Sequence, residues 1–251
     1  QNMPTTESAI RTFGFSQLYV SLGDVKPDGD TTVNAVQTAL ENGYRHIDTA
    51  MIYRNETSVG EGIRRSGVPR GDLFVTTKLW NDDIRAHRGK EAFQESLDRL
   101  GMDYVDLYLI HWPNPKQGLY VEAWQALIDA QKKGQIKSIG VSNFLPEHLE
   151  VLKKETGVMP VINQIELHPY FNQAEQRAYH QQHGILTMAW SPLGRARDVF
   201  QEPVLQQIAE QLGKSVAQII LKWQIQLGVI PIPKATSGQN QLANKAIFQF
   251  E

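Results

Sequence analysis

The sequence contains no cysteine and no long apolar run. The lack of cysteine excludes disulfides, thiolate metal ligands and cysteine nucleophiles. A membrane helix needs ~18 consecutive apolar residues, so we expect no membrane span. The opening residues, QNMPTTESAIRTFG, lack the apolar core of a signal peptide. We therefore expect a cytoplasmic protein.

The chain also has little net charge. Its formal charge is -2 and its pI is about 6.4, which favours neither nucleic acid nor an anionic membrane as a partner. Hydrophobic residues make up 41% and charged residues 21%, values that suit a globular protein with a substantial core. Since nothing in this composition requires an oligomer, a monomer is expected.

Several common ligand-binding motifs are absent. The sequence has no G-x-G-x-x-G and no G-x-x-x-x-G-K-[ST], which removes the usual sign of a doubly wound nucleotide-binding sheet. It has no H-E-x-x-H and no Ser-His-Asp order typical of hydrolases, so we expect neither a metal site nor a serine nucleophile.

The sequence instead shows a regular alternation of strands and helices. Apolar runs rich in β-branched residues alternate with segments of helical periodicity that end in glycine. Eight such units without a linker predict one domain, residues 1–251, with the α/β fold of a (β/α)₈ TIM barrel. The predicted strands cover residues 18–22, 44–48, 73–80, 105–112, 136–144, 161–167, 185–193 and 229–234. The predicted helices cover residues 31–43, 55–67, 89–101, 121–134, 146–157, 173–184, 203–213, 215–228 and 237–248.

Polar side chains gather at the carboxyl ends of these strands. In a barrel these ends meet at one rim, where the active sites of this fold are built. Asp48, Lys78 and His111 are 30 and 33 residues apart, about one unit each. The further strand-end residues are Ser142, Asn143, Gln164, Trp190, Ser191 and Lys234.

Each of these residues also has a simpler structural interpretation. Asp48 could cap a helix, Lys78 could be a surface lysine, His111 could be a core histidine and Tyr53 could be a packing residue. Their convergence at one rim favours chemistry instead. A lysine inside the barrel would need a carboxylate partner, for which Asp48 is the obvious candidate. A phenol beside that ammonium would have a lowered pKa and could protonate a developing alkoxide, while an imidazole orients the carbonyl.

Six segments together resemble the signature segments of the aldo-keto reductase superfamily. They are YRHIDTAMIYRNE, LFVTTKLWN, YVDLYLIHWP, IGVSNF, NQIELHPY and WSPLG, and they occur in the right order and spacing. The bacterial branch of 2,5-diketo-D-gluconate and methylglyoxal reductases is the most similar, because the link HWPNPKQGLYVEAW is short and Trp190 replaces the usual tyrosine.

The resemblance implies a TIM barrel that reduces a small-molecule carbonyl with NADPH. It implies that Tyr53 is the proton donor, that Lys78 and Asp48 lower its pKa, and that His111 orients the substrate between Trp80 and Trp112. The hydride then comes from the cofactor. The resemblance also implies contacts with the cofactor's carboxamide, nicotinamide, pyrophosphate and adenosine phosphate by Ser142, Asn143, Gln164, Trp190, Ser191, Leu193, Gly194, Lys234, Ala235, Thr236, Ser237, Asn240 and Asn244.

The sequence departs from the family pattern in four places. LYVSLGD replaces the usual G-L-G-T-[WF] near the first strand. The arginine that usually binds the 2′-phosphate aligns with Asn240. Ala235 replaces the usual small hydroxyl residue after Lys234, and Ala243 replaces the usual glutamate before Asn244. These changes imply a modest preference for NADPH over a possible NADH. Members usually continue with a further helix and tail that this domain is expected to lack. Two alternatives stay open: a catalytically weak regulatory or structural protein of this fold, and a barrel enzyme acting on sugar phosphates.

Overall fold

The computed structural model describes residues 19–21, 29–194 and 197–233, and its strands form one sheet. All seven pairings between consecutive strands are parallel, and the spatial order follows the chain. This order confirms the predicted (β/α)₈ TIM barrel. The strands are β1 (Tyr19–Ser21), β2 (His46–Asp48), β3 (Phe74–Leu79), β4 (Val105–Ile110), β5 (Ile136–Ser142), β6 (Ile162–Glu166), β7 (Leu186–Trp190) and β8 (Ile230–Pro231).

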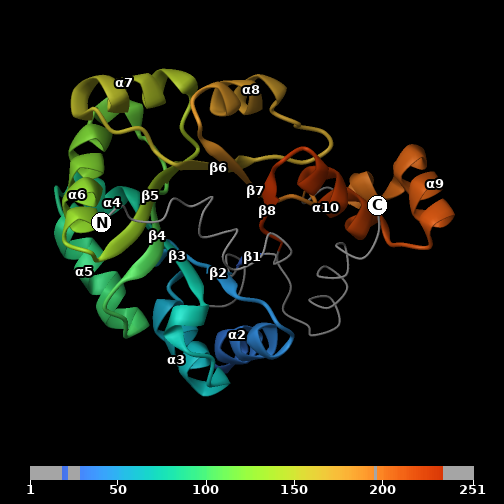
Figure 1. Ribbon diagram of the computed structural model, residues 1–251, viewed down its shortest axis with the longest axis horizontal. Helices are drawn as coiled ribbons and strands as arrows, with labels where there is room; N and C mark the ends of the chain where they lie inside the picture. The colour runs from blue at the N-terminus through green and yellow to red at the C-terminus, as the bar shows by residue number, and fades with distance from the viewer. Residues whose placement is uncertain (1–18, 22–28, 195–196, 234–251) are drawn as a thin grey trace.

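Helices cover the outside of the strands, and α9 lies farthest from them, against α10 (Figure 1). The α-helices are α2 (Asp30–Glu41), α3 (Glu56–Ser66), α4 (Asn81–Arg85), α5 (Gly89–Leu100), α6 (Tyr120–Lys132), α7 (Pro146–Thr156), α8 (Ala174–Gln182), α9 (Pro203–Leu212) and α10 (Val216–Gln226). Short 3₁₀ helices are η1 (Met51–Tyr53), η2 (Arg70–Asp72), η3 (Pro115–Gln117) and η4 (Arg197–Gln201).

Within the described residues, each predicted strand and helix is found, usually one or two residues shorter at its ends. The predicted helix 237–248 lies outside those residues. The sequence did not predict η1 and α4, which follow β2 and β3 at the rim. No helix in the part of the chain that the structure describes is long and apolar enough to span a membrane.

The interior of the barrel changes from apolar to polar along the strands. Because strand side chains alternate between faces, Phe74, Thr76 and Lys78 share one face of β3, and Leu107 and Leu109 share one face of β4. The inner apolar cluster consists of Phe74, Leu107, Leu109, Ile162, Met188, Ile230 and Ile232. The same alternation, continued toward the strand ends, brings Asp48, Lys78, Ser142, Gln164 and Trp190 to one rim.

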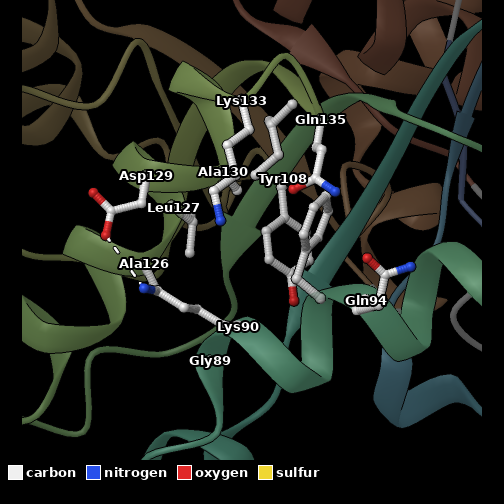
Figure 2. Close-up of a pocket in the computed structure, with 12 residues that line it drawn as sticks. Gly89, Lys90, Gln94, Tyr108, Ala126, Leu127, Asp129, Ala130, Lys133 and Gln135 are labelled. Carbon is white, nitrogen blue, oxygen red and sulfur yellow. Dashed lines mark ion pairs between the residues drawn. The ribbon is translucent and has the colours of Figure 1, made fainter.

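A cavity of about 230 Å³ lies on the other side of β4, between α5 and α6 (Figure 2). Tyr108, which faces these helices, contributes its ring, and the ion pair of Lys90 with Asp129 (3.7 Å) crosses beside it. The Tyr108 hydroxyl is buried without a hydrogen-bond partner among the described residues. Leu107 and Leu109 point to the inward face of β4 whereas Tyr108 points outward, so this cavity lies outside the barrel and is distinct from the rim.

We predict that Gly60→Ala destabilises the protein, although alanine is normally the better helix residue. A Cβ at Gly60 in α3 would lie 2.3 Å from the carbonyl oxygen of Leu100 at the end of α5. Overpacking of this kind costs about 1–3 kcal/mol of unfolding free energy, which urea denaturation would measure. Gly71→Ala is the control, because nothing lies within 4 Å of a Cβ there. Equal stability of the two variants would contradict the prediction.

Candidate active site

Asp48 and Lys78 form a buried ion pair between neighbouring strands. Asp48 ends β2 and pairs in register with Thr76, two residues before Lys78 on the same face of β3. Lys78 Nζ donates to Asp48 Oδ1 at 2.5 Å and to the Thr49 carbonyl oxygen at 3.0 Å. The two side chains are 1% and 0% exposed, so the surface-lysine interpretation is wrong. The helix-cap interpretation is also wrong, because Ala50 rather than Asp48 caps η1.

This arrangement keeps the Lys78 ammonium charged. Burial alone would lower the pKa of Lys78, but the charge of Asp48 and then interactions with Tyr53 outweigh it, so the pKa lies above its ordinary value. Gln164, from β6, donates from Nε2 to the other carboxylate oxygen, Asp48 Oδ2, at 2.9 Å. Both oxygens of Asp48 therefore have a donor, as a buried carboxylate requires.

Tyr53 lies beside the ion pair, at the end of η1. The strand β2 ends at Asp48, and the turn of η1 brings the half-buried Tyr53 ring back over the rim. Lys78 Nζ is 5.5 Å from the centre of that ring. The His111 ring meets it edge-on at 6.0 Å. A phenol, an ammonium and an imidazole thus face one another.

His111 follows β4 and is surrounded by aromatic rings. Trp80 contacts it edge-on at 5.2 Å, and Trp112 lies nearly parallel to it at 6.4 Å. Burial, and then the positive charge of Lys78, lower the pKa of His111 to about 3. The imidazole is therefore neutral at physiological pH, and it can offer a hydrogen bond without carrying a charge. Trp112 is 39% exposed, which leaves an indole at the mouth of the site.

The predicted cofactor residues on β5 and β7 bond to one another. Asn143, in a left-handed conformation (φ 62°), donates to the His111 carbonyl oxygen at 3.0 Å and accepts from Trp190 Nε1 at 2.7 Å. Ser142 Oγ donates to the backbone oxygen of Gln164 at 2.7 Å. This network fixes the plane of the Trp190 ring and joins it to the strand that carries His111.

A family model described as the aldo/keto reductase family matches residues 19–251. The chain belongs to the aldo/keto reductase family. It is 50% identical over 232 residues to an aldo-keto reductase of Mycolicibacterium smegmatis, covering 92% of this chain and 84% of the relative. Methylglyoxal reductase DkgA of Salmonella typhimurium is 46% identical with the same coverage. The 2,5-diketo-D-gluconic acid reductase B of a Corynebacterium species is 44% identical, covering 91% and 83%.

Solved structures of this family have the same fold. An aldo/keto reductase from Brucella melitensis superposes with a TM-score of 0.87 at 51% identity, covering 93% of this chain and 88% of that one. A mutant of Gox0644 in complex with NADPH gives 0.88 at 43% identity, covering 93% and 84%. These likenesses confirm the family that the six sequence segments predicted.

The remaining predicted residues of this aldo-keto reductase divide into two groups. Ser191, Leu193 and Gly194 form a turn after β7, in which the Gly194 amide donates to the Ser191 carbonyl oxygen at 2.8 Å. Gly194 has φ 79°, and a Cβ there would lie 3.2 Å from the His168 ring. The other group lies outside the described residues: Lys234, Ala235, Thr236, Ser237, Asn240 and Asn244.

Sequence reasoning missed the polar network behind the rim. Glu56 is 1% exposed and accepts from Thr77 Oγ1 at 2.6 Å and from Arg99 Nε at 2.9 Å. Asn55 accepts from Thr49 Oγ1 at 2.6 Å. These bonds tie the segment after Tyr53 to β3 and α5. The signal available in the sequence was two polar residues, Asn55 and Glu56, directly after Tyr53 at the start of a helix.

We predict that Lys78→Met raises the pKa of His111 from about 3. The variant removes the positive charge that opposes the imidazolium, while burial still holds the pKa below 6.5. NMR titration of the imidazole proton signals would measure this change. His180 is the internal control, because burial and His183, rather than Lys78, lower its pKa to about 4. An unchanged His111 titration would show that Lys78 exerts no charge effect on it.

The lowered pKa of His111 also predicts how the free energy of unfolding changes at acid pH. Its pKa is lower in the folded protein than the ordinary value of 6.5, so the unfolded chain binds more protons between those two values. The free energy of unfolding should therefore fall as the pH drops from 6.5 toward 3. In Lys78→Met the His111 part of that fall should be smaller.

Proposed function

We propose that this aldo-keto reductase reduces aldehydes, ketones and α-dicarbonyls to alcohols with NADPH. The observation that carries the proposal is the Tyr53 phenol beside the buried Asp48–Lys78 pair and the neutral His111. Family membership supports carbonyl reduction as the general reaction. The relatives named for methylglyoxal and 2,5-diketo-D-gluconic acid support small dicarbonyls as the substrate class. The neighbour in complex with NADPH supports the choice of cofactor.

In this mechanism Tyr53 is the general acid. NADPH, when bound, supplies a hydride to the carbonyl carbon. Tyr53 gives its proton to the carbonyl oxygen as negative charge develops there. Lys78 stabilises the resulting phenolate, because an ammonium beside the phenol favours its ionised form. Asp48 keeps that ammonium charged within the buried site, so the three groups act as one unit.

His111 orients the substrate. Its low pKa leaves the imidazole neutral, so it donates a hydrogen bond to the carbonyl oxygen and does not compete with Tyr53 for the acid role. Trp80 and Trp112 flank the imidazole and provide flat apolar walls. These walls suit a small substrate whose carbonyl points down toward Tyr53.

The residues at the rim fit the nicotinamide end of the cofactor. The half-buried Trp190 ring is held in one plane by Asn143 and offers a face for stacking. Gln164 directs its amide nitrogen to Asp48, which leaves its carbonyl oxygen to accept from a carboxamide. Ser142 and Asn143 border the same space. The turn Ser191 to Gly194 would approach the pyrophosphate, and Lys234, Ala235, Thr236, Ser237, Asn240 and Asn244 are proposed for the adenosine phosphate.

The sequence left two alternative functions open, and the family assignment excludes one of them. The family assignment removes a barrel enzyme of another class acting on sugar phosphates. A catalytically weak regulatory or structural protein remains the second candidate, and the complete set of Asp48, Tyr53, Lys78 and His111 argues against it. The single-domain description of residues 1–251, the monomeric state and the cytoplasmic location stay predictions.

We predict that Tyr53→Phe lowers kcat for methylglyoxal reduction by at least ~100-fold, the usual scale for a general acid. The change keeps the ring and removes the proton, so NADPH affinity, measured by fluorescence titration, should change little. Oxidation of NADPH followed by absorbance gives the rate. Tyr104→Phe, another partly exposed tyrosine at the opposite end of the strands, is the control. Near wild-type turnover of Tyr53→Phe would exclude Tyr53 as the acid.

We also predict that Asn240→Arg raises the ratio of kcat/KM for NADPH over NADH by on the order of tenfold, chiefly through KM. An arginine offers two parallel charge-assisted hydrogen bonds to a 2′-phosphate, each worth roughly 1.5–3 kcal/mol. Gln241→Arg is the control, because it adds the same charge at the adjacent position. Both cofactors must be compared at one ionic strength, since salt screens the phosphate. A ratio that Asn240→Arg leaves unchanged would contradict this assignment of the phosphate site.

A further inference from the structure

Gln164 occupies a position between the cofactor site and the catalytic ion pair. Its side chain is 3% exposed and donates from Nε2 to Asp48 Oδ2 at 2.9 Å. The other oxygen, Oδ1, accepts from Lys78. Residues 116 apart in sequence are thereby joined across the barrel, from β6 to β2. A contact with the cofactor alone would not require this bond.

The backbone of Gln164 is fixed from the opposite side. Its carbonyl oxygen accepts from Ser142 Oγ at 2.7 Å and from the Asn143 amide at 3.0 Å. Ser142 and Gln164 are also paired in the register of β5 and β6. Two hydrogen bonds therefore fix the backbone from which the Gln164 side chain extends. The bond to Asp48 then costs little additional conformational entropy.

The bond matters because the carboxylate is buried. A buried carboxylate that lacks a donor for one oxygen is strongly destabilised in its ionised form. The titratable groups that face Lys78 in the described structure are Asp48 from β2, Tyr53 from η1 and His111 after β4. Among these, Asp48 supplies the negative charge that offsets the burial of the ammonium. A carboxylate that turned away from Lys78 would therefore stabilise the charged ammonium less.

We infer that Gln164 is a positioning residue for the catalytic acid: by holding Oδ2 of Asp48, it keeps the carboxylate directed at Lys78. Lys78 then remains charged beside Tyr53. This inference rests on the proposed reduction with Tyr53 as the acid. It gives Gln164 a role that is separate from any contact between its carbonyl oxygen and the cofactor.

The first experiment uses the cofactor-free protein. The ¹³Cε signals of labelled lysines are followed against pH in the wild-type protein and in Gln164→Met, which keeps the length of the side chain and removes the amide. The Lys78 titration should move to lower pH by ~1 pH unit, because an opposite charge in close contact shifts a pKa by ~1–3 units and Gln164→Met lets the Asp48 carboxylate turn away from Lys78. Gln224→Met is the matched control, because Gln224 is also buried and its amide donates to the Leu167 and Pro192 carbonyl oxygens. It should lower stability and leave the Lys78 titration unchanged.

The second experiment separates positioning from cofactor contact. The pH profile of kcat is measured with NADPH and with its reduced 3-acetylpyridine analogue, which has no carboxamide N–H to give to Gln164. The positioning role predicts that Gln164→Met moves the alkaline limb to higher pH with either cofactor, because a weaker Lys78 charge raises the pH at which Tyr53 loses its proton. A contact with the carboxamide alone predicts a higher KM for NADPH, no such penalty for the analogue, and an unchanged limb.

The outcomes distinguish the positioning role of Gln164 from the proposed reduction through Tyr53. If Lys78 titrates as in the wild-type protein and the alkaline limb stays in place, the positioning role is wrong while reduction through Tyr53 is unaffected. If Tyr53→Phe keeps its turnover, the proposed function itself fails, whatever Gln164→Met does. A moved Lys78 titration together with a moved limb for both cofactors supports the inference.

Discussion

The interaction on which the site depends is the buried ion pair between Asp48 and Lys78. Removing two charges from water costs several kcal/mol per ion, and only close geometry with further hydrogen bonds offsets that cost. The Thr49 carbonyl oxygen and Gln164 provide those further bonds. The pair is therefore weak evidence for stability, and its chief effect is to place one buried ammonium beside one phenol.

The ion pair also constrains the register of the sheet. Side chains on a strand alternate with a period of two, so a shift of one residue in β3 would turn Lys78 toward the helices and expose Thr77 to the interior. The apolar cluster around Phe74 and Leu107 opposes that shift, because the same slip would remove it from the core. One alternating pattern thus fixes an apolar core lower in the barrel and a charged rim above it. The site is a continuation of the core in the same register.

The sequence predicted the strands, their polar ends and the family, since these depend on local periodicity and on contiguous segments. It did not predict that Gln164 bonds Asp48, that Asn143 joins His111 to Trp190, or that Glu56 ties α3 to Thr77 and Arg99. Each of these bonds links residues from different strands or helices, and several alternative partners have the right chemistry. The short elements η1 and α4 also escaped prediction, because three to five residues carry too little periodicity.

The two faces of strand β4 lie in different environments, the barrel interior and the surrounding helix layer. Its inward residues Leu107 and Leu109 fill the core, and His111 follows them at the rim, whereas Tyr108 faces α5 and α6. Burial holds the pKa of Tyr108 well above its ordinary value, so this phenol stays neutral. Tyr53 has the opposite surroundings, with an ammonium close to its ring and partial exposure at the rim. The same side chain thus stays neutral in the helix layer, whereas at the rim it lies beside an ammonium, the setting that the proposed proton transfer requires. The reactivity of a phenol follows from the neighbouring charge rather than from the phenol itself.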